Sequence, residues 1–301
     1  MLSIDHVYKT FGDRTVLTDL NFTVHSGEVY GLLGPNGAGK TTTINIICNL
    51  LKPDRGSIQI LNQPVSEATK TLVGIAPQEN LLYRSLTCSE NLHFFARLYG
   101  LSQVERIEQV YHCLQLVNLL DRADSLVENL SGGMQRRLSI ALALVHHPKL
   151  VILDEPTTGL DIEARYEVWE LIRLLKRQGI TVLLTTHLLE EAEQLCQRIG
   201  VIKGGKLLRE GTLQELARCV PAAAIALVDT PQPDRAMSRA QQLGWPIRHY
   251  GRDLAFCLPQ PFTLADILQQ LHGIALTSVS VQPVRLDHIY LEITRDAGKT
   301  G

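Results

Sequence analysis

One segment of eight residues constrains the fold of this chain more than any other. It fits the pattern G-x-x-x-x-G-K-[ST] and consists of Gly34, Pro35, Asn36, Gly37, Ala38, Gly39, Lys40 and Thr41. The segment stands between the apolar run VYGLLG and the stretch TTTINIICNLL, whose apolar residues recur at helical spacing. A glycine loop between a strand and a helix lets backbone N–H groups surround a phosphate, and the helix N-terminus favours negative charge. The sequence therefore predicts a phosphate-binding loop within an α/β domain.

Two side chains of this loop have a predicted chemical role. Lys40 supplies a mobile positive charge for the β- and γ-phosphates of a nucleotide, and the hydroxyl of Thr41 can coordinate Mg²⁺. The next residue, Thr42, extends the predicted phosphate-binding set. The loop therefore implies a nucleoside triphosphate together with Mg²⁺.

An acidic pair ends a second buried-strand pattern, LVILDEP at 150–156. Because ligands of open parallel sheets lie outside the carboxyl ends of the strands, we expect both acids near the phosphate loop. Asp154 is predicted to hold Mg²⁺, directly or through water, and Glu155 to orient or deprotonate the attacking water. His187 follows the apolar strand TVLLTT and is placed to contact the γ-phosphate, whereas Gln78 offers an uncharged oxygen to Mg²⁺ or water. Read singly, the histidine and the glutamine would be ordinary structural or solvated residues.

Composition argues against several classes of protein. Lys and Arg number 29 against 31 Asp and Glu, so no basic excess exists to bind nucleic acid. The six cysteines include no CxxC pair, which argues against a zinc ribbon or a disulfide framework and favours a reducing cytosol. The start lacks a signal-peptide pattern, and no apolar run approaches the roughly 18 residues that a spanning helix requires. We therefore expect a cytoplasmic protein that reaches a membrane only through a partner.

The length of 301 residues suggests two domains, which we expect to meet near residue 215. Residues 1–215 show short antiparallel strands at the start, a parallel-sheet rhythm of strands and helices, and a helical insertion at about 89–148. Residues 216–301 show the order strand, helix, two strands, helix, strand. That order fits a small α+β domain of the ferredoxin-like type.

The segment NLSGGMQ at 129–135 precedes a helical pattern and lies before LVILDEP. It resembles the signature motif of the ABC ATPase family. The other motifs occur in that family's order, namely the Walker A loop at 34–41, the Q-loop residue Gln78, the Walker B acids, the D-loop at 159–161 and the switch residue His187. The resemblance covers about residues 1–215. It implies the P-loop NTPase fold, ATP and Mg²⁺ as cofactors, and ATP hydrolysis as the activity.

The resemblance also implies a head-to-tail pair of ATPase subunits, either a homodimer or two related chains. Each signature turn, itself an anion-binding helix N-terminus, would close over the nucleotide of the other subunit. The residues implied to act in this way are Ser131, Gly132, Gly133 and Gln135, with Asp161 in the adjoining D-loop. The family places an aromatic ring under the adenine, and the matching residue here is Phe11, where tyrosine is frequent. The alternative is that Phe11 fills the core.

Two segments resemble the exporter branch of the family, whose subunits pair with separate type-two permeases, as drug-efflux ATPases do. They are PQENLLYRSLTCSENLHFFARLYGL around and after Gln78 and RLDHIYLEITR at 285–295. The resemblance implies that a permease helix docks between Gln78 and about Tyr99, and that the transported substrate binds the permease and not this chain. It also implies a position on the inner face of the cell membrane, held there by the permease.

Three other functions stay open at this point. An ABC ATPase without a transport role is disfavoured by the single phosphate loop and by the lack of a long heptad insertion. A kinase or GTPase would require LSGGM to be a coincidence, and the sequence lacks the guanine-reading pattern N/T-K-x-D. An importer subunit is the alternative within the family, although such subunits tend to carry a longer regulatory β domain than residues 216–301 can supply.

Overall fold

The structure, a computed structural model, describes residues 1–251 and 253–296. It divides into two compact units, of which the first is Met1–Thr212 and the second begins at Leu213. The division falls at 212 and not at 215 because helix α7 (Leu213–Ala217) packs against helix α10 (Leu286–Asp296) of the second unit. The last five residues of the predicted second domain lie outside the described part of the chain.

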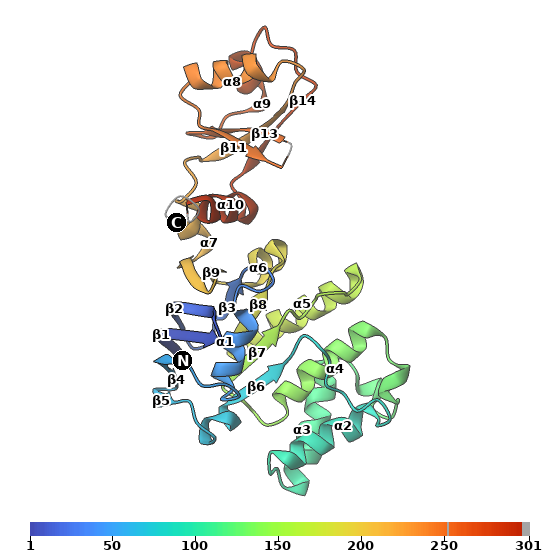
Figure 1. The fold of residues 1–301 in the computed structure, drawn as a ribbon. Helices are drawn as coiled ribbons and strands as arrows, with labels where there is room; N and C mark the ends of the chain where they lie inside the picture. The colour runs from blue at the N-terminus through green and yellow to red at the C-terminus, as the bar shows by residue number, and fades with distance from the viewer. Residues whose placement is uncertain (252, 297–301) are drawn as a thin grey trace. The chain divides into compact units, whose positions relative to one another are not determined.

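The first unit contains two sheets (Figure 1). Across the six-stranded sheet the order is β10 (Lys206–Gly211), β9 (Arg198–Lys203), β3 (Val29–Leu33), β8 (Thr181–Thr186), β7 (Leu150–Asp154) and β6 (Val73–Ala76). Its strand pairs are parallel except for the hairpin of β9 and β10 at one edge. Across the four-stranded antiparallel sheet the order is β2 (Arg14–Val24), β1 (Leu2–Phe11), β4 (Arg55–Ile60) and β5 (Gln63–Pro64). The predicted parallel core and N-terminal antiparallel strands are confirmed.

The helices of the first unit follow the strands as the sequence patterns predict. The α-helices are α1 (Lys40–Ile47), α2 (Cys88–Leu98), α3 (Gln103–Leu116), α4 (Gly132–Leu144), α5 (Ile162–Arg177) and α6 (Leu189–Leu195). Short 3-10 turns lie at η1 (Ala68–Leu72), η2 (Leu120–Arg122) and η3 (Val127–Asn129).

Alternation along β7 shows how the core is layered. Its four apolar side chains are fully buried, which for residues of this kind stabilises the fold by about 1.5–3 kcal/mol each. Leu150 and Ile152 pack with α1 and the antiparallel sheet, whereas Val151 and Leu153 pack with the helices from α2 to α5. The continuous apolar run of the sequence is therefore explained by a sheet that is covered on both faces.

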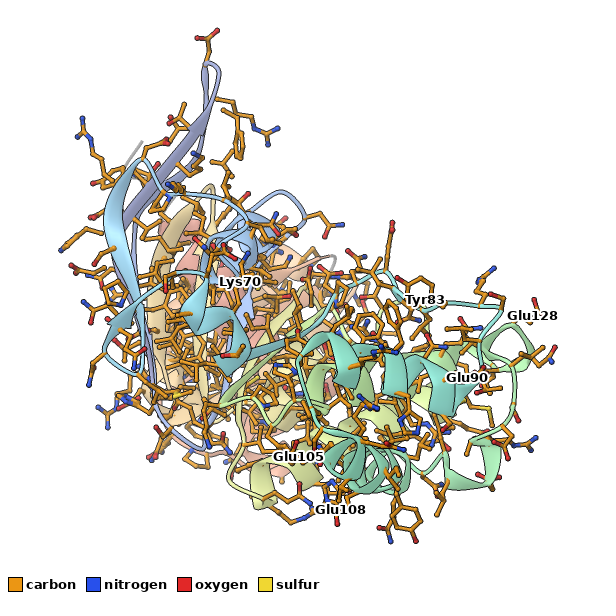
Figure 2. The ribbon with its side chains drawn as sticks, turned by 90° about the horizontal axis from the view of Figure 1, so that it is seen from below. Lys70, Tyr83, Glu90, Glu105, Glu108 and Glu128 are labelled. Carbon is orange, nitrogen blue, oxygen red and sulfur yellow. The ribbon has the colours of Figure 1, made fainter. Side chains whose placement is uncertain are left out.

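Local sequence signals begin the two outer helices of the predicted insertion. Thr87 and Glu90 form a capping box at the start of α2, and Ser102 and Glu105 form another at the start of α3. Figure 2 labels the two glutamates. The predicted insertion of about 89–148 contains α2, α3 and α4, but α4 also packs against β6, β7 and α5. Helix α4 therefore belongs to the ATPase core as much as to the insertion.

The second unit is an antiparallel sheet with helices on its faces. Its further elements are β11 (Ala224–Asp229), α8 (Pro233–Gln242), β12 (Ile247–Tyr250), β13 (Asp253–Leu258), α9 (Leu264–Gln270) and β14 (Ser278–Pro283). The order across the sheet is β12-β13-β11-β14, and each neighbouring pair is antiparallel. The first strand of the unit, β11, therefore lies between β13 and β14. This strand order, together with the order of elements along the chain, is that of the predicted ferredoxin-like type.

Side chains alternate along the strands of this second sheet. Ala226 and Phe256 on one face join a core with residues of α8 and α9. The other face contacts α10, where Glu292 pairs with Arg248 of β12 and His288 lies within 3.2 Å of Gln282 of β14. Among the residues that the structure describes, no helix combines the length and the apolar character needed to span a bilayer.

Candidate nucleotide site

Four neighbouring strands of the six-stranded sheet bring the predicted site residues together. Strands β3, β8, β7 and β6 lie side by side and run parallel, so their carboxyl ends meet at one edge. The phosphate loop follows β3, His187 follows β8, Asp154 and Glu155 end β7, and Gln78 follows β6. The site therefore arises from sheet order, which places next to one another segments that are far apart in the sequence.

The phosphate loop depends on glycine at positions where another residue would be strained or would clash. Gly37 and Gly39 have φ angles of 77° and 107°, in the region that favours glycine. A Cβ atom at Gly39 would lie 2.6 Å from Cδ2 of Leu17 on β2, a distance that requires a shift. The antiparallel sheet thus packs directly against the loop, and the glycine pattern is a consequence of that close approach.

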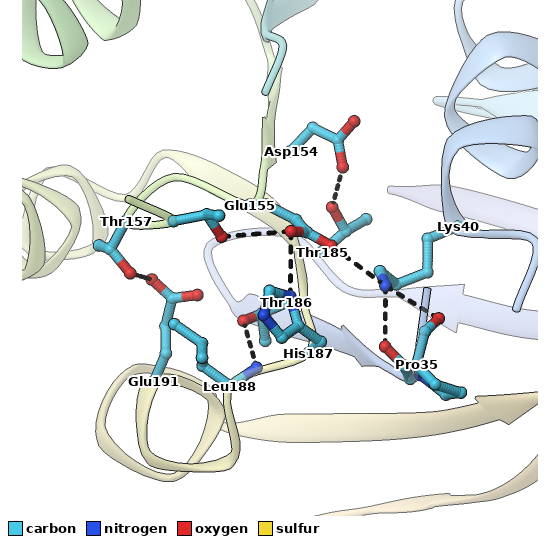
Figure 3. A network of polar contacts seen from close by, with 12 residues as sticks. Pro35, Lys40, Asp154, Glu155, Thr157, Thr185, Thr186, His187, Leu188 and Glu191 are labelled. Atoms are coloured by element: carbon cyan, nitrogen blue, oxygen red, sulfur yellow. Dashed lines mark hydrogen bonds and ion pairs between the residues drawn. The ribbon is translucent and has the colours of Figure 1, made fainter. Parts of the chain in front are cut away.

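Lys40 lies at the start of α1 and is almost completely buried. Its ammonium group donates to the carbonyl oxygens of Gly34 at 2.8 Å and Pro35 at 3.2 Å, and it lies 3.2 Å from Oε1 of Glu155 (Figure 3). The lysine is therefore held inside the loop by groups that a phosphate can replace.

Glu155 is the centre of the polar network in Figure 3. While Oε1 faces Lys40, Oε2 lies 3.0 Å from Nδ1 of His187 and accepts a hydrogen bond of 3.2 Å from the hydroxyl of Thr158. The residue has a φ of 46°, an unusual conformation for a side chain of this size, and strain of this kind is common at functional sites. At the end of β7, one carboxylate oxygen of Glu155 therefore contacts Lys40 and the other contacts His187, both of which are candidate catalytic residues.

The two neighbouring acids have opposite electrostatic settings. Burial raises the pKa of Asp154, although a hydrogen bond from the Thr185 hydroxyl on the adjacent strand opposes that rise. Burial is also the largest single influence on Glu155 and acts to raise its pKa, but the charges and hydrogen bonds of Lys40 and His187 together outweigh it, so the net pKa is below its ordinary value. Glu155 is therefore ionised at neutral pH.

A cleft of about 360 Å³ lies above the phosphate loop. Eight predicted site residues line it, namely Asn36, Gly37, Gly39, Lys40, Thr41, Thr42, Gln78 and Glu155. Two further lining residues, Arg14 and Val16 of β2, were not predicted. The antiparallel sheet brings them there, and no local signal in the sequence distinguishes them. Gly34, Pro35 and Ala38 form the backbone of the loop without lining the cleft.

The donor set near the cleft fits a magnesium ion. Asp154 offers a buried carboxylate, Thr41 a hydroxyl and Gln78 an amide oxygen, and hard divalent cations prefer oxygen ligands. No cluster of three His, Cys, Asp or Glu side chains with metal-ligand geometry occurs within residues 1–251 and 253–296. Magnesium is usually held by one or two carboxylates together with substrate phosphates and water.

Phe11 ends β1 and is half exposed, so it is not a core residue. The ammonium group of Lys9 lies 5.5 Å from the centre of its ring. Phe11 does not line the cleft of the phosphate loop in this structure. Its stacking on an adenine stays a prediction, and the exposed ring face is available for it.

The signature turn begins α4, where the Ser131 hydroxyl caps the helix by accepting from the backbone N–H of Met134 at 3.3 Å. Ser131 and Gly132 are exposed, and neither lines the cleft of its own chain. A Cβ atom at Gly133 would lie 2.6 Å from Cβ of Ala164, so this glycine permits close packing against α5. The Gln135 amide donates to the carbonyl oxygens of Val127 and Leu130 and thereby holds the turn.

Asp161 also has a structural partner within the chain. Its carboxylate caps α5 by accepting from the backbone N–H of Ala164 at 2.8 Å. The residue is exposed, and its contact with a second subunit stays a prediction. Both its cap and the packing of Gly133 involve Ala164, so the signature turn and the D-loop are built against each other.

Three buried residues support the site and were not predicted. Thr185 donates to Asp154, and Glu191 of α6 accepts a 2.7 Å hydrogen bond from Thr157 in the loop after Glu155. Arg136 of α4 donates to backbone carbonyls on both sides of Glu155. Thr185 lies in β8, Arg136 in α4 and Glu191 in α6, and none of the three belongs to a motif that the sequence analysis singled out.

Comparison with known proteins agrees with this geometry. Residues 17–158 match the family model described as ABC transporter. The chain is 37% identical over 297 residues to the Nod factor export ATP-binding protein I of Cupriavidus pinatubonensis, covering 98% of this chain and 90% of the relative. It is 42% identical over 219 residues to the linearmycin resistance ATP-binding protein of Bacillus subtilis, covering 72% of this chain and 70% of that protein.

Solved structures show the same fold for the first unit. An ATP-binding subunit of an ABC transporter superposes with a TM-score of 0.66 at 33% identity, covering 72% of this chain and 92% of that one. A dimeric ATP-binding cassette in a post-hydrolysis state, bound to ADP and Pi, has a TM-score of 0.63 at 30% identity, covering 70% of this chain and 98% of that one.

The motifs, the fold, the site and the relatives lead to the same assignment. The glycine loop, the two acids and the histidine meet at one sheet edge, as a nucleotide-hydrolysing site requires. The chain belongs to the ABC transporter family, as one of its ATP-binding and ATP-hydrolysing subunits.

Proposed function

We propose that this chain powers the export of a substrate through a separate membrane permease and that it works as one of two ATPase subunits that close over ATP. The names of its relatives, a Nod factor export protein and a linearmycin resistance protein, support the direction of transport. The permease would hold the chain at the inner face of the membrane and would bind the transported substrate.

The observation that carries this proposal is the exposed signature turn. Ser131 and Gly132 begin a thirteen-residue helix, yet the turn faces solvent and not the cleft that holds Lys40. A helix N-terminus of this kind binds anions through its free N–H groups. A second copy, or a related subunit, would supply its own phosphate loop to this turn and receive the same in return.

The arrangement of Lys40 and Glu155 gives the hydrolysis a sequence of steps. The phosphates of ATP would take over the ammonium group of Lys40, which now contacts Glu155 at 3.2 Å. Release from that positive charge would raise the pKa of Glu155 and make the carboxylate a stronger base. The site thus becomes a better catalyst only when its substrate is bound.

The chemical step would be an in-line displacement at the γ-phosphorus. Water forms the new P–O bond, the bond to the bridging oxygen of ADP breaks, and the proton of the water passes toward Glu155. His187, which lies 3.0 Å from Glu155, would hold the carboxylate and contact the γ-phosphate. Mg²⁺ held by Thr41, Asp154 and Gln78 would neutralise charge on the phosphates.

A trapped dimer provides the test. The variant Glu155→Gln should bind ATP but lose about 100-fold or more of the hydrolysis rate, because it lacks the base. On gel filtration with ATP and Mg²⁺ it should therefore accumulate as a dimer, while the same variant with ADP stays monomeric. A Glu155→Gln protein that stays monomeric in saturating ATP, as measured by light scattering, would contradict the two-subunit mechanism.

The proposed permease contact lies between Gln78 and about Tyr99. Five large apolar side chains in this segment are exposed, namely Leu81, Tyr83, Phe94, Leu98 and Tyr99. The rings of Tyr83, labelled in Figure 2, and Phe94 pack edge to face with centroids 4.9 Å apart. These two rings therefore form a fixed apolar surface before any partner binds. The variant Tyr83→Cys is expected to form crosslinks to the co-purified permease, and crosslinks that form only with residues beyond 212 would overturn this contact.

A further inference from the structure

Arg136 is a buried cation that connects three parts of the ATPase unit. It lies on α4, five residues after the Ser131 cap, and only 3% of its surface is exposed. Its Nε and one terminal nitrogen each donate at 2.8 Å, to the carbonyl oxygens of Pro156 and Asp154. The other terminal nitrogen donates to the carbonyl of Pro77 and, at 3.3 Å, to Oδ1 of Asn80.

These partners bracket two of the candidate catalytic residues. Asp154 and Pro156 are the neighbours of Glu155 on both sides, and Pro77 and Asn80 stand on either side of Gln78. One guanidinium group therefore fixes the backbone that carries the base and the backbone that carries the Q-loop glutamine. Both loops are tied to the helix that begins with the signature turn.

The burial of Arg136 is not explained by an ion pair. Within the part of the chain that the structure describes, no carboxylate lies within salt-bridge distance of its guanidinium group. Burial lowers the pKa of Arg136 to about 10, although the charges of Asp154 and Glu191 favour the cation. Because a buried charge without an ion pair is costly, the hydrogen bonds of the guanidinium group are needed to stabilise it here.

That geometry is one which arginine alone can supply. A guanidinium group is a rigid planar fork with five donors, so it can bond to two loops at once, whereas lysine offers one compact charge on a flexible stem. Glu155 has a strained φ of 46°, and such a conformation persists only where the surroundings fix it. Bonds to the carbonyls on both sides of Glu155 provide this constraint.

We propose that Arg136 is a positioning residue for ATP hydrolysis. It fixes the positions of Glu155 and Gln78 relative to each other and to the helix that begins with the signature turn. It does not touch the nucleotide cleft. Displacement of the segment around Gln78 would therefore be transmitted through this side chain to the Glu155 turn. The inference depends on the ATPase chemistry of the chain and not on the direction of transport.

The neighbouring Arg137 offers a matched control. It is on the same helix, is similarly buried, and donates to the carbonyl oxygens of Val117 at 2.7 Å and Asn118 at 3.1 Å. It also lies 3.4 Å from Glu167 of α5, so its partners lie away from both catalytic loops. Arg136→Lys and Arg137→Lys therefore both keep the positive charge and both remove a guanidinium group that binds backbone carbonyls. Only Arg136→Lys removes hydrogen bonds to the loops that carry Glu155 and Gln78.

The experiment measures kcat, KM and thermal unfolding of the full chain without a permease, so its result does not depend on the exporter assignment. We expect Arg136→Lys to lower kcat by about 10–100-fold, as small misplacement of catalytic groups does, with KM for ATP changed less than about threefold. Arg137→Lys should lower the unfolding temperature by a similar amount but leave kcat within about threefold of the wild type. Equal kcat values for the two lysine variants would overturn the proposal.

A milder variant guards against misfolding. Asn80→Ala removes only one weak partner of Arg136 at the partly exposed Q-loop, so the chain should fold normally. We expect a decrease in kcat of about two- to fivefold that does not add to the effect of Arg136→Lys, because both changes act on one connection. Full additivity of the two effects would show that Arg136 does not act through the Q-loop and would likewise overturn the proposal.

Discussion

The two units of this chain bury polar side chains for different purposes. At the carboxyl edge of the six-stranded sheet, Lys40 and Glu155 are buried around a cleft, and a ligand can replace their mutual contact. In the second unit, Arg248 of strand β12 is paired with Glu292 of helix α10. The comparison teaches that a buried ion pair becomes a candidate catalytic pair when it borders a cleft at the ends of parallel strands.

The largest effect should come from breaking the exchangeable pair. Lys40→Ala removes the charge that would contact the β- and γ-phosphates, and we expect ATP hydrolysis to fall by at least about 100-fold. The pKa of Glu155 should rise at the same time, because the charge of Lys40 holds it down. Steady-state ATPase assays check the rate, and circular dichroism serves as the control for folding. Substantial hydrolysis by a well-folded Lys40→Ala protein would contradict the site.

A smaller effect, on stability, should come from breaking the structural pair. Glu292→Ala leaves Arg248 without its partner in a partly buried position, and we expect the second unit to lose about 3 kcal/mol of unfolding free energy. The ATPase rate of the first unit should change less than about twofold, since no predicted site residue lies beyond residue 212. Urea unfolding followed by fluorescence of Trp245, which is buried in the second unit, measures the loss.

The double variant Arg248→Ala with Glu292→Ala sharpens this test. Removing both charges avoids an unpaired buried cation, so the double variant should be more stable than Glu292→Ala alone. If it is less stable by the full sum of the single losses, the pair is not the structural unit that we describe.

The smallest effect is a pH dependence that involves Glu191. Burial raises the pKa of this carboxyl above its ordinary value of 4.5, while hydrogen bonds from Thr157 and Trp169 oppose the rise. The unfolded chain therefore releases this proton at lower pH than the folded chain does, so the residue costs stability as pH rises from 4.5 through the raised pKa.

Glu191→Gln cannot lose that proton. Relative to the wild type, its unfolding free energy should therefore increase as pH rises from about 4.5 and become constant once the folded wild type has ionised. Denaturant titrations of both proteins across this range provide the measurement. A difference that stays constant with pH would show that Glu191 has no raised pKa in the folded state.

Much of the site could be predicted because its chemistry lies in short contiguous motifs. The glycine loop from Gly34 to Thr41, the acids at the end of β7 and the histidine that follows β8 can each be found from a strand pattern and the residues that follow it. The order of elements in the second unit could also be predicted, because turn residues separate short patterns of clear periodicity.

Other parts of the site could not be predicted. Arg14 lines the cleft because β2 packs across the phosphate loop, and Glu191 supports the loop after Glu155 because α6 returns to it. Nothing near either residue in the chain distinguishes it from an ordinary surface arginine or an ordinary helical acid. Their roles depend on contacts between segments that are far apart in the sequence.

The sequence by itself determined which chemistry this chain can perform, because phosphate binding and water activation need particular residue types at fixed local spacings. Only the tertiary structure decided how those residues share their contacts. Glu155 divides its two oxygens between Lys40 and His187 because β8 lies between β3 and β7, and Arg136 reaches both loops because α4 packs beneath them. The physical reason is that hydrogen-bonding partners are chosen by distance in space, and strand order sets that distance where the local sequence cannot.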